Sequence, residues 1–280
     1  MEVTFVGTGS GKTQIKRFHT SLLINNGNYN VLIDSGDGIS KALLSLKIDL
    51  KIIDSIFITH THADHFSGIA SLLTQMKMAD RSKPLNLYIH KTFVKFATNF
   101  LHYSFLFPET FNFRFNIIGF NSNAKIELSD NFHLFTAQNN HIFDKHKLNV
   151  IPKSRFISNS VLIKSKNCQI HYSSDIGLIS DLSLFSKFKP NILIVESTHI
   201  PFNEIIEFLD DSEYQKVYFV HINDGDNIVE LHSKLSNQQK NKYFLTFDGM
   251  QATMPYWQNI FVNISEISFP LLYLHSILFR

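Results

Sequence analysis

Ile56-Phe57-Ile58-Thr59-His60-Thr61-His62-Ala63-Asp64-His65-Phe66 is the stretch that decides the fold. Its first residues are β-branched or aromatic, which is typical of a short buried strand. The residues that follow, Phe66–Met78, carry apolar side chains at helical spacing. Four potential metal ligands therefore stand between a strand and a helix: His60, His62, Asp64 and His65. Imidazole and carboxylate groups suit zinc, manganese or iron.

These four side chains predict two metal ions rather than one. They lie so close together in the chain that the backbone between them is too short for all four to reach one ion. His60 and His62 are alternate residues and point the same way as the strand runs out. Asp64 and His65 lie past the turn and aim elsewhere. We expect two neighbouring divalent cations, with zinc as the first choice and manganese or iron as alternatives.

The rest of the chain alternates short strand-like runs with helical stretches. Strands are predicted at 2–6, 21–25, 29–34, 55–59, 132–137, 160–164, 169–173, 192–195, 217–220 and 243–247, and helices at 38–46, 66–78, 203–209 and 227–235. Strands come first in clusters and then alternate with helices. This order predicts an α+β fold in which two packed mixed sheets carry helices on their outer faces, as one domain over residues 1–280.

Two segments stand apart in composition. Residues 84–120 are dense in phenylalanine and tyrosine, and we expect them to pack in the core and against helices. The alternative is an apolar wall over a substrate pocket or a dimer surface. The apolar tail, residues 256–280, is expected to pack on its own domain or on a second subunit, so a homodimer is compatible with the sequence.

Charge and cysteine content limit the class of protein. The net charge of +2 is close to balance, which argues against a concentrated basic surface for long nucleic acid. The single cysteine, Cys168, excludes an intrachain disulfide and a cysteine-rich zinc site. We expect no membrane span and, because the first residues do not resemble a signal peptide, a cytoplasmic location.

The motif resembles the metallo-β-lactamase superfamily, and the resemblance extends over most of the chain. It implies the αββα sandwich of that family and three further ligands in the order of the chain. His141 follows a predicted strand, Asp175 ends Gln169-Ile170-His171-Tyr172-Ser173-Ser174-Asp175, and His221 ends Val217-Tyr218-Phe219-Val220-His221. On this pattern His60, His62 and His141 hold one ion, Asp64, His65 and His221 hold the other, and Asp175 bridges both.

The amino-terminal motifs resemble the ribonuclease Z branch and its small-phosphodiesterase relatives. They are Val6-Gly7-Thr8-Gly9-Ser10-Gly11 and Ile33-Asp34-Ser35-Gly36-Asp37-Gly38, and Glu196-Ser197-Thr198-His199 and Phe247-Asp248-Gly249-Met250 fit the same branch. Two features depart from a tRNA-processing enzyme. No arm rich in glycine and proline separates His141 from Asp175, and only residues 197–220 separate Glu196 from His221.

The first functional interpretation is a metal-dependent phosphodiesterase that acts on a small or cyclic nucleotide or on an RNA 3′ end. Two ions that share a water lower its pKa toward about 7, which makes a bridging hydroxide available, and Asp64 is the catalytic residue that orients it. His199 and Glu196 are weak candidates for the acid that protonates the leaving group.

Two other interpretations stay open. A thioesterase or lactonase would use Phe93–Phe115 as an acyl pocket. A non-catalytic or biosynthetic accessory protein is favoured by His221-Ile222-Asn223-Asp224, which is similar to the pyrroloquinoline-quinone accessory protein B family.

Overall fold

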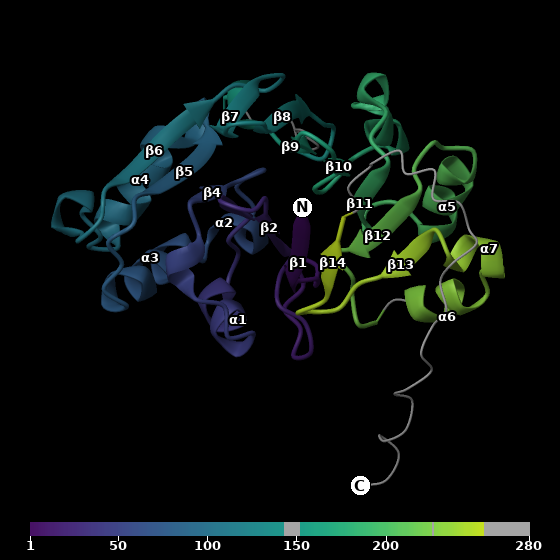
Figure 1. The fold of residues 1–280 in the computed structure, drawn as a ribbon, viewed down its shortest axis with the longest axis horizontal. Coiled ribbons are helices and arrows are strands. Elements are labelled where there is room, and N and C mark those ends of the chain that lie inside the picture. Colours follow the sequence, from purple (N-terminus) through teal and green to yellow (C-terminus); the bar gives the residue numbers. More distant parts are fainter. Residues whose placement is uncertain (143–151, 226, 255–280) are drawn as a thin grey trace, which may run out of the picture.

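Two seven-stranded mixed sheets face each other and carry their helices on the outside (Figure 1). The computed structural model describes residues 1–142, 152–225 and 227–254. The predicted arrangement of two packed mixed sheets with outer helices is confirmed.

The first sheet has the strand order β14-β1-β2-β3-β4-β5-β6. Its strands are β14 (Gln251–Thr253), β1 (Glu2–Gly7), β2 (Ser21–Asn25), β3 (Asn30–Ile33), β4 (Ser55–Phe57), β5 (Leu85–His90) and β6 (Phe115–Phe120). Pairing is antiparallel from β14 to β3 and parallel from β3 to β6. The carboxyl ends of β3 and β4 therefore lie side by side at one edge of the sheet.

The second sheet has the order β13-β12-β11-β10-β9-β8-β7. Its strands are β13 (Tyr243–Leu245), β12 (Lys216–Val220), β11 (Ile192–Glu196), β10 (Gln169–Tyr172), β9 (Asn159–Lys164), β8 (Phe132–Gln138) and β7 (Lys125–Ser129). The pairs from β13 to β10 are parallel, and those from β10 to β7 are antiparallel. This mirrors the first sheet, so β10, β11 and β12 also end at a common edge.

Helices cover the outer face of each sheet. The first sheet carries α1 (Ile39–Ser45), α3 (Ile69–Met78) and α4 (Val94–Tyr103), and the second carries α5 (Phe202–Asp210), α6 (Ile228–Ser233) and α7 (Asn237–Lys240). The four-residue helix α2 (Ala63–Phe66) lies inside the ligand-rich loop. Helix α3 buries Ile69, Leu72, Leu73 and Met76, as their spacing predicts. No helix in the described ranges is long and apolar enough to cross a membrane.

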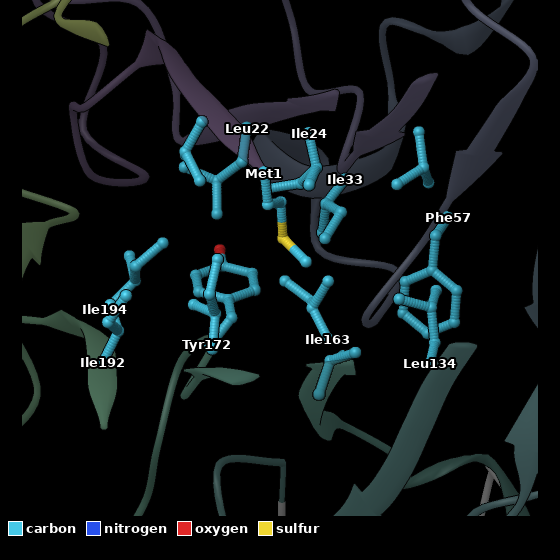
Figure 2. Close-up of a cluster of buried hydrophobic side chains, with 14 of the residues drawn as sticks. Met1, Leu22, Ile24, Ile33, Phe57, Leu134, Ile163, Tyr172, Ile192 and Ile194 are labelled. Atoms are coloured by element: carbon cyan, nitrogen blue, oxygen red, sulfur yellow. The ribbon is translucent and has the colours of Figure 1, made fainter. Parts of the chain in front are cut away.

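The strands bury both of their faces, because alternate side chains enter two different apolar layers. Leu22 and Ile24 enter the layer between the sheets, whereas Leu23 packs in the layer beneath the helices. Across the inter-sheet layer, residues such as Tyr172 and Ile163 of the second sheet face the first (Figure 2). Each fully buried aliphatic side chain contributes about 1.5–3 kcal/mol, so the strand ends are fixed by a rigid scaffold.

The aromatic segment 84–120 supplies β5, α4 and β6 to the first sheet and its outer layer. Phe113 and Phe115 are buried there, as expected for core packing, while Phe96, Tyr103 and Phe105 are exposed. The apolar tail, residues 256–280, lies outside the described residues. The assignment of residues 1–280 to one domain therefore stays a prediction.

Candidate metal centre

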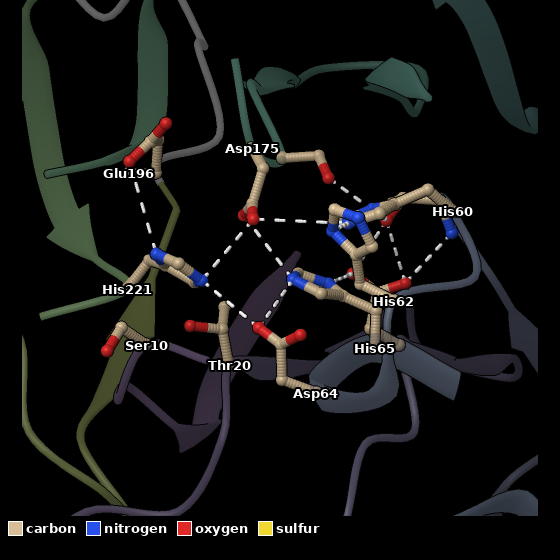
Figure 3. Close-up of polar contacts among 12 residues, drawn as sticks. Ser10, Thr20, His60, His62, Asp64, His65, Asp175, Glu196 and His221 are labelled. Carbon is tan, nitrogen blue, oxygen red and sulfur yellow. Dashed lines mark hydrogen bonds and ion pairs between the residues drawn. The ribbon is translucent and has the colours of Figure 1, made fainter. Parts of the chain in front are cut away.

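The seven side chains singled out in the sequence converge at the carboxyl ends of four strands. His60, His62, Asp64 and His65 follow β4, His141 follows β8, Asp175 follows β10 and His221 follows β12. Figure 3 shows Asp175 in the middle of this group, between His221 on one side and His60 and His65 on the other. Both sheets therefore contribute to one centre, and residues far apart in the chain become neighbours.

The first half of the centre consists of three histidines and Asp175. Their ligand atoms all lie within 4.8 Å of one another. Nδ1 of His62 is 3.1 Å from Nε2 of His60 and 3.1 Å from Nε2 of His141. Oδ2 of Asp175 is 3.5 Å from Nε2 of His141 and 3.9 Å from Nε2 of His60.

The second half consists of Asp64, His65, His221 and again Asp175. Oδ2 of Asp64 is 3.2 Å from Nε2 of His65 and 3.2 Å from Nε2 of His221. Asp175 is 3.4 Å from each of the same two imidazoles, through Oδ1 to His65 and Oδ2 to His221. Asp175 is thus the one side chain that the two groups share, which is the position expected of a bridging carboxylate.

Asp34 and Thr59 orient two of the imidazoles from outside. Asp34 is fully buried at the end of β3 and accepts a hydrogen bond from Nδ1 of His65 at 2.8 Å. The Thr59 hydroxyl donates to Asp34, so its oxygen is left to accept from Nδ1 of His60 at 3.0 Å. Nδ1 of each imidazole is thereby held as a donor and Nε2 faces the centre, which is how outer partners prepare histidine ligands.

Glu196 and Thr198 do the same for His221. The Thr198 hydroxyl donates to Oε2 of Glu196 at 3.1 Å, and its oxygen lies 2.6 Å from Nδ1 of His221. Nδ1 of His221 is therefore the donor in this contact, and Nε2 is left with a free lone pair toward Asp64 and Asp175. Glu196 is 1% exposed at the end of β11.

Burial and charge favour neutral imidazoles beside ionised carboxylates. Burial lowers the pKa of His60 well below its ordinary value and that of His141 to about 4. Burial alone would raise the pKa of Asp175, but His221 and His65 outweigh it and lower the pKa well below the usual range. His65 is the exception, because Asp175 and Asp34 overcome the effect of burial and raise its pKa.

The donor set fits divalent cations. Nε2 of His65 and Oδ1 of Asp175 are buried and make no hydrogen bond within the described part of the chain. Buried polar atoms of this kind are rare in folded proteins and call for a partner. Five imidazoles and two carboxylates in two groups are the ligands that zinc, manganese or iron accept, so a pair of cations would satisfy both orphaned atoms.

Backbone conformation at the strand ends also marks this region. Asp34, Ser174 and His221 have positive φ values of 64°, 53° and 57°, which residues other than glycine rarely adopt. A Cβ at Gly36 would lie 1.9 Å from the carbonyl oxygen of Asp64, so only glycine lets the two loops approach this closely. These loops keep an unfavourable conformation where their side chains must meet.

His199 is an imidazole of the centre that belongs to neither half. Its Nδ1 is 2.8 Å from Oε1 of Glu196, and its ring centroid is 4.6 Å from that of His141. Although burial lowers the pKa of His199, the hydrogen bond to Glu196 raises it above the ordinary value. The side chain is 39% exposed, so its other nitrogen can reach a bound molecule.

Sequence reasoning missed the outer partners. In the sequence, Asp34 and Thr198 belong to motifs that fit the family, and nothing there marks them or Thr59 as partners of the imidazoles. The available signal was position, because each of these residues stands directly at or just after the end of a predicted parallel strand. His171 is buried, and its Nδ1 lies 2.7 Å from the Tyr214 hydroxyl.

An open cavity of about 300 Å³ lies over the centre. Its walls include His62, Asp64, His199, His221, Lys12 and Asn223. Lys12 belongs to the loop after β1, which is held near β12 by a hydrogen bond from Ser10 to Asn223. A ligand in this cavity would touch both halves of the centre and a lysine.

Comparison with known proteins finds one family model and several curated relatives that match the chain. The family model described as "Anti-Pycsar protein Apyc1" matches residues 1–244. The chain is 26% identical over 237 residues to ribonuclease Z of Pyrococcus furiosus, covering 71% of this chain and 75% of that protein. Ribonuclease Z of Thermococcus onnurineus is 33% identical over 108 residues, covering 39% of this chain and 35% of that protein.

Solved structures resemble the chain at the level of the fold. The short form of human tRNase Z superposes with a TM-score of 0.69 at 18% identity, covering 91% of this chain and 100% of that one. The metallo-β-lactamase fold protein YhfI of Bacillus subtilis gives 0.69 at 15% identity, covering 90% and 98%. The αββα sandwich is confirmed. The chain spans about a third of the length of the first curated relatives that it matches.

Proposed function

The chain belongs to the anti-Pycsar protein Apyc1 family, within the metallo-β-lactamase superfamily, and from that premise we propose that it is a dinuclear metal-dependent phosphodiesterase acting on a small cyclic nucleotide. The observation that carries the proposal is the pair of ligand groups that share Asp175. His60, His62 and His141 would hold one cation and Asp64, His65 and His221 the other. Zinc is the metal that this donor set favours.

The chemistry of such a centre suits a phosphodiester. When bound, two adjacent divalent cations lower the pKa of a water and neutralise charge on the attacked group. Asp64 lies in the wall of the cavity, where it can orient the attacking oxygen. Lys12, in the cavity wall, offers a cation to the phosphate.

His199 is the group placed to protonate the leaving oxygen. Glu196 holds its Nδ1, so the proton on Nε2 faces the cavity. The same Glu196 also accepts the backbone N–H groups of Thr198 and His199 at 2.8 and 2.9 Å, which fixes the turn that carries the imidazole. A ribose alkoxide is a poor leaving group, so proton donation in this position would contribute roughly 100-fold or more.

Size and charge favour a small substrate. The cavity over the centre is about 300 Å³, within the usual range for small-molecule sites. The net charge of +2 provides little attraction for a long polyanion. The proposed setting is the cytoplasm, where nucleotides are plentiful, and the proposal is compatible with a monomer or a homodimer.

Hydrolysis of an RNA 3′ end is the second candidate, because the curated relatives named above are ribonuclease Z proteins. The deciding experiment offers zinc-loaded protein a set of 3′,5′-cyclic nucleotides, a precursor tRNA, an acyl thioester and a lactone. We expect cyclic nucleotides to be opened to linear nucleotides and the other substrates to remain intact.

Two controls connect that activity to the centre. Chelator treatment and His62→Ala should each abolish turnover, and zinc should restore it only after chelation. Full activity in either preparation, or cleavage of the thioester or lactone alone, would contradict the proposal. Cleavage of the precursor tRNA alone would favour the second candidate.

A further inference from the structure

A second cavity, of about 620 Å³, lies beside the metal centre at the amino-terminal half of α4. We call it the α4 cavity, and its walls include Thr61, Phe93, Lys95, Phe96, Asn99 and Arg155. Arg155 comes from the short turn η4 (Lys153–Arg155), which packs against η2 (Lys91–Phe93) directly before α4. None of these residues belongs to the proposed ligand set.

The α4 cavity and the cavity over the metals meet at the ligand loop. Thr61 lines the α4 cavity, and the next residue, His62, lines the cavity over the metals. Consecutive Cα atoms are about 3.8 Å apart. A substrate whose phosphodiester lies on the metals can therefore extend past the ligand loop toward the α4 cavity.

One wall of the α4 cavity is a fixed aromatic surface. Phe96 is 47% exposed, although its ring packs against Phe66 and Phe100, whose centroids lie 5.2 and 6.2 Å away. Phe66 directly follows the ligand His65, so the same short helix, α2, holds both the metal centre and this support. An exposed ring with a packed back is preorganised to stack on a planar group.

Besides Phe93 and Phe96, the residues of the wall are polar, and they mainly donate hydrogen bonds. Lys95 and Arg155 carry donors and no acceptors, whereas Asn99 carries both. An acyl chain would leave these groups without partners. A planar heterocycle with oxygen and nitrogen atoms on its edge would use the ring and the polar rim together.

We infer that the α4 cavity receives the nucleobase of the substrate, with Phe96 as the stacking surface and Lys95, Asn99 and Arg155 facing the edge of the base. This inference rests on the proposed phosphodiesterase function and adds a binding subsite to it. The cavity volume accommodates a purine or a pyrimidine. Stacking on Phe96 supplies most of the affinity, and the polar rim supplies preference among bases.

The test compares two substrates that differ only in the base. One is a 3′,5′-cyclic nucleotide and the other is methyl ribofuranoside 3′,5′-cyclic phosphate, which has the same phosphodiester and no base. Phe96→Ala is expected to raise KM for the cyclic nucleotide about tenfold, with kcat and zinc content unchanged. The same variant should leave the kinetics of the base-free substrate at the wild-type values, and Phe96→Tyr should restore KM.

Tyr103→Ala is the matched control, because Tyr103 is an 86% exposed aromatic residue of the same helix that does not line the α4 cavity. It should leave KM for both substrates unchanged. Arg155→Gln should raise KM several-fold for the cyclic nucleotide only. If Arg155→Gln affects both substrates equally, the cation binds phosphate and its assignment to the base is wrong.

Equal KM values for wild type and Phe96→Ala on the cyclic nucleotide would overturn the inference while the enzyme remains a phosphodiesterase. An equal rise in KM on both substrates would overturn it as well. If zinc-loaded wild-type protein hydrolyses neither substrate, the proposed function fails, and the assignment of a base subsite fails with it.

Discussion

The same arrangement of side chains occurs at two places in the molecule. One is the carboxyl ends of β3 and β4, and the other is the carboxyl ends of β11 and β12. At the first edge, buried Asp34 accepts from Thr59, and the Thr59 oxygen accepts from Nδ1 of His60. At the second edge, buried Glu196 accepts from Thr198, whose oxygen lies 2.6 Å from Nδ1 of His221. In each case a parallel pair of strands brings a carboxylate, a hydroxyl and an imidazole into line.

The two edges differ in what else the carboxylate holds. Asp34 also holds Nδ1 of His65, a second proposed ligand that is fully buried. Glu196 instead holds His199, which is 39% exposed beside the cavity. The first edge is therefore built only to hold cations, whereas the second edge holds a cation and leaves one imidazole available for proton transfer.

Asp34→Ala should have the largest effect, because it removes partners from Thr59 and His65 together. Loss of such an outer carboxylate lowers metal affinity by about 10–100-fold, and breaking a buried pair costs about 3 kcal/mol of unfolding free energy. Zinc titration and urea unfolding measure the two effects. Asp37→Ala, at an exposed carboxylate three residues on, is the control. Wild-type zinc affinity and stability in Asp34→Ala would contradict the role given to the carboxylate at the first edge.

Glu196→Gln should affect catalysis more than cation binding. Because Glu196 raises the pKa of His199 and the protonated imidazole is the active form, activity is lost as the pH rises through that pKa. Removing the carboxylate lowers the pKa, so the alkaline limb of kcat should move to lower pH, with roughly a tenfold loss near pH 8.

The control for Glu196→Gln is an aryl phosphodiester, whose phenolate leaves without a proton. Its alkaline limb should stay where it is in wild-type protein. An unchanged limb for the cyclic nucleotide would remove His199 from the mechanism and make the two edges equivalent.

The hydroxyl bridges should give the smallest effects. Thr59→Val should lower zinc binding by about 1 kcal/mol, because a buried hydrogen bond to His60 is lost without replacement. Thr198 is partly exposed beside the cavity, so water can replace its hydroxyl, and Thr198→Val should cost about half as much. The two values come from parallel zinc titrations. Equal losses of zinc affinity in the two variants would mean that the exposure of the hydroxyl does not distinguish the two edges.

Regular elements with clear periodicity were predictable from the sequence. The strand predicted at 21–25 matches β2 to the residue, and the helical spacing of 66–78 corresponds to α3. The prediction omits β5 and β6, although β5 alternates apolar Leu85, Leu87 and Ile89 with more polar residues, because 84–120 was interpreted by its aromatic content alone. The strand β14 forms by pairing with β1, which local sequence does not encode.

The candidate site, like the fold, was predictable only in part from the sequence. A cluster of ligand-type residues after a strand is visible in the sequence, and order along the chain suggested His141, Asp175 and His221. The structure brings all seven together, and their role as ligands remains a proposal. What local sequence does not contain is the outer carboxylate of His65, since Asp34 is 31 positions before His65 and the two meet only through the pairing of β3 with β4.

The metal content of the full-length protein, measured by elemental mass spectrometry after zinc loading and removal of free zinc, tests the account most directly. Two zinc ions per chain are expected for the wild type. Asp175→Ala should retain at most one, because both ligand groups lose the carboxylate they share. A wild-type protein that binds no zinc, or an Asp175→Ala variant that keeps two ions as tightly as the wild type, would contradict the account.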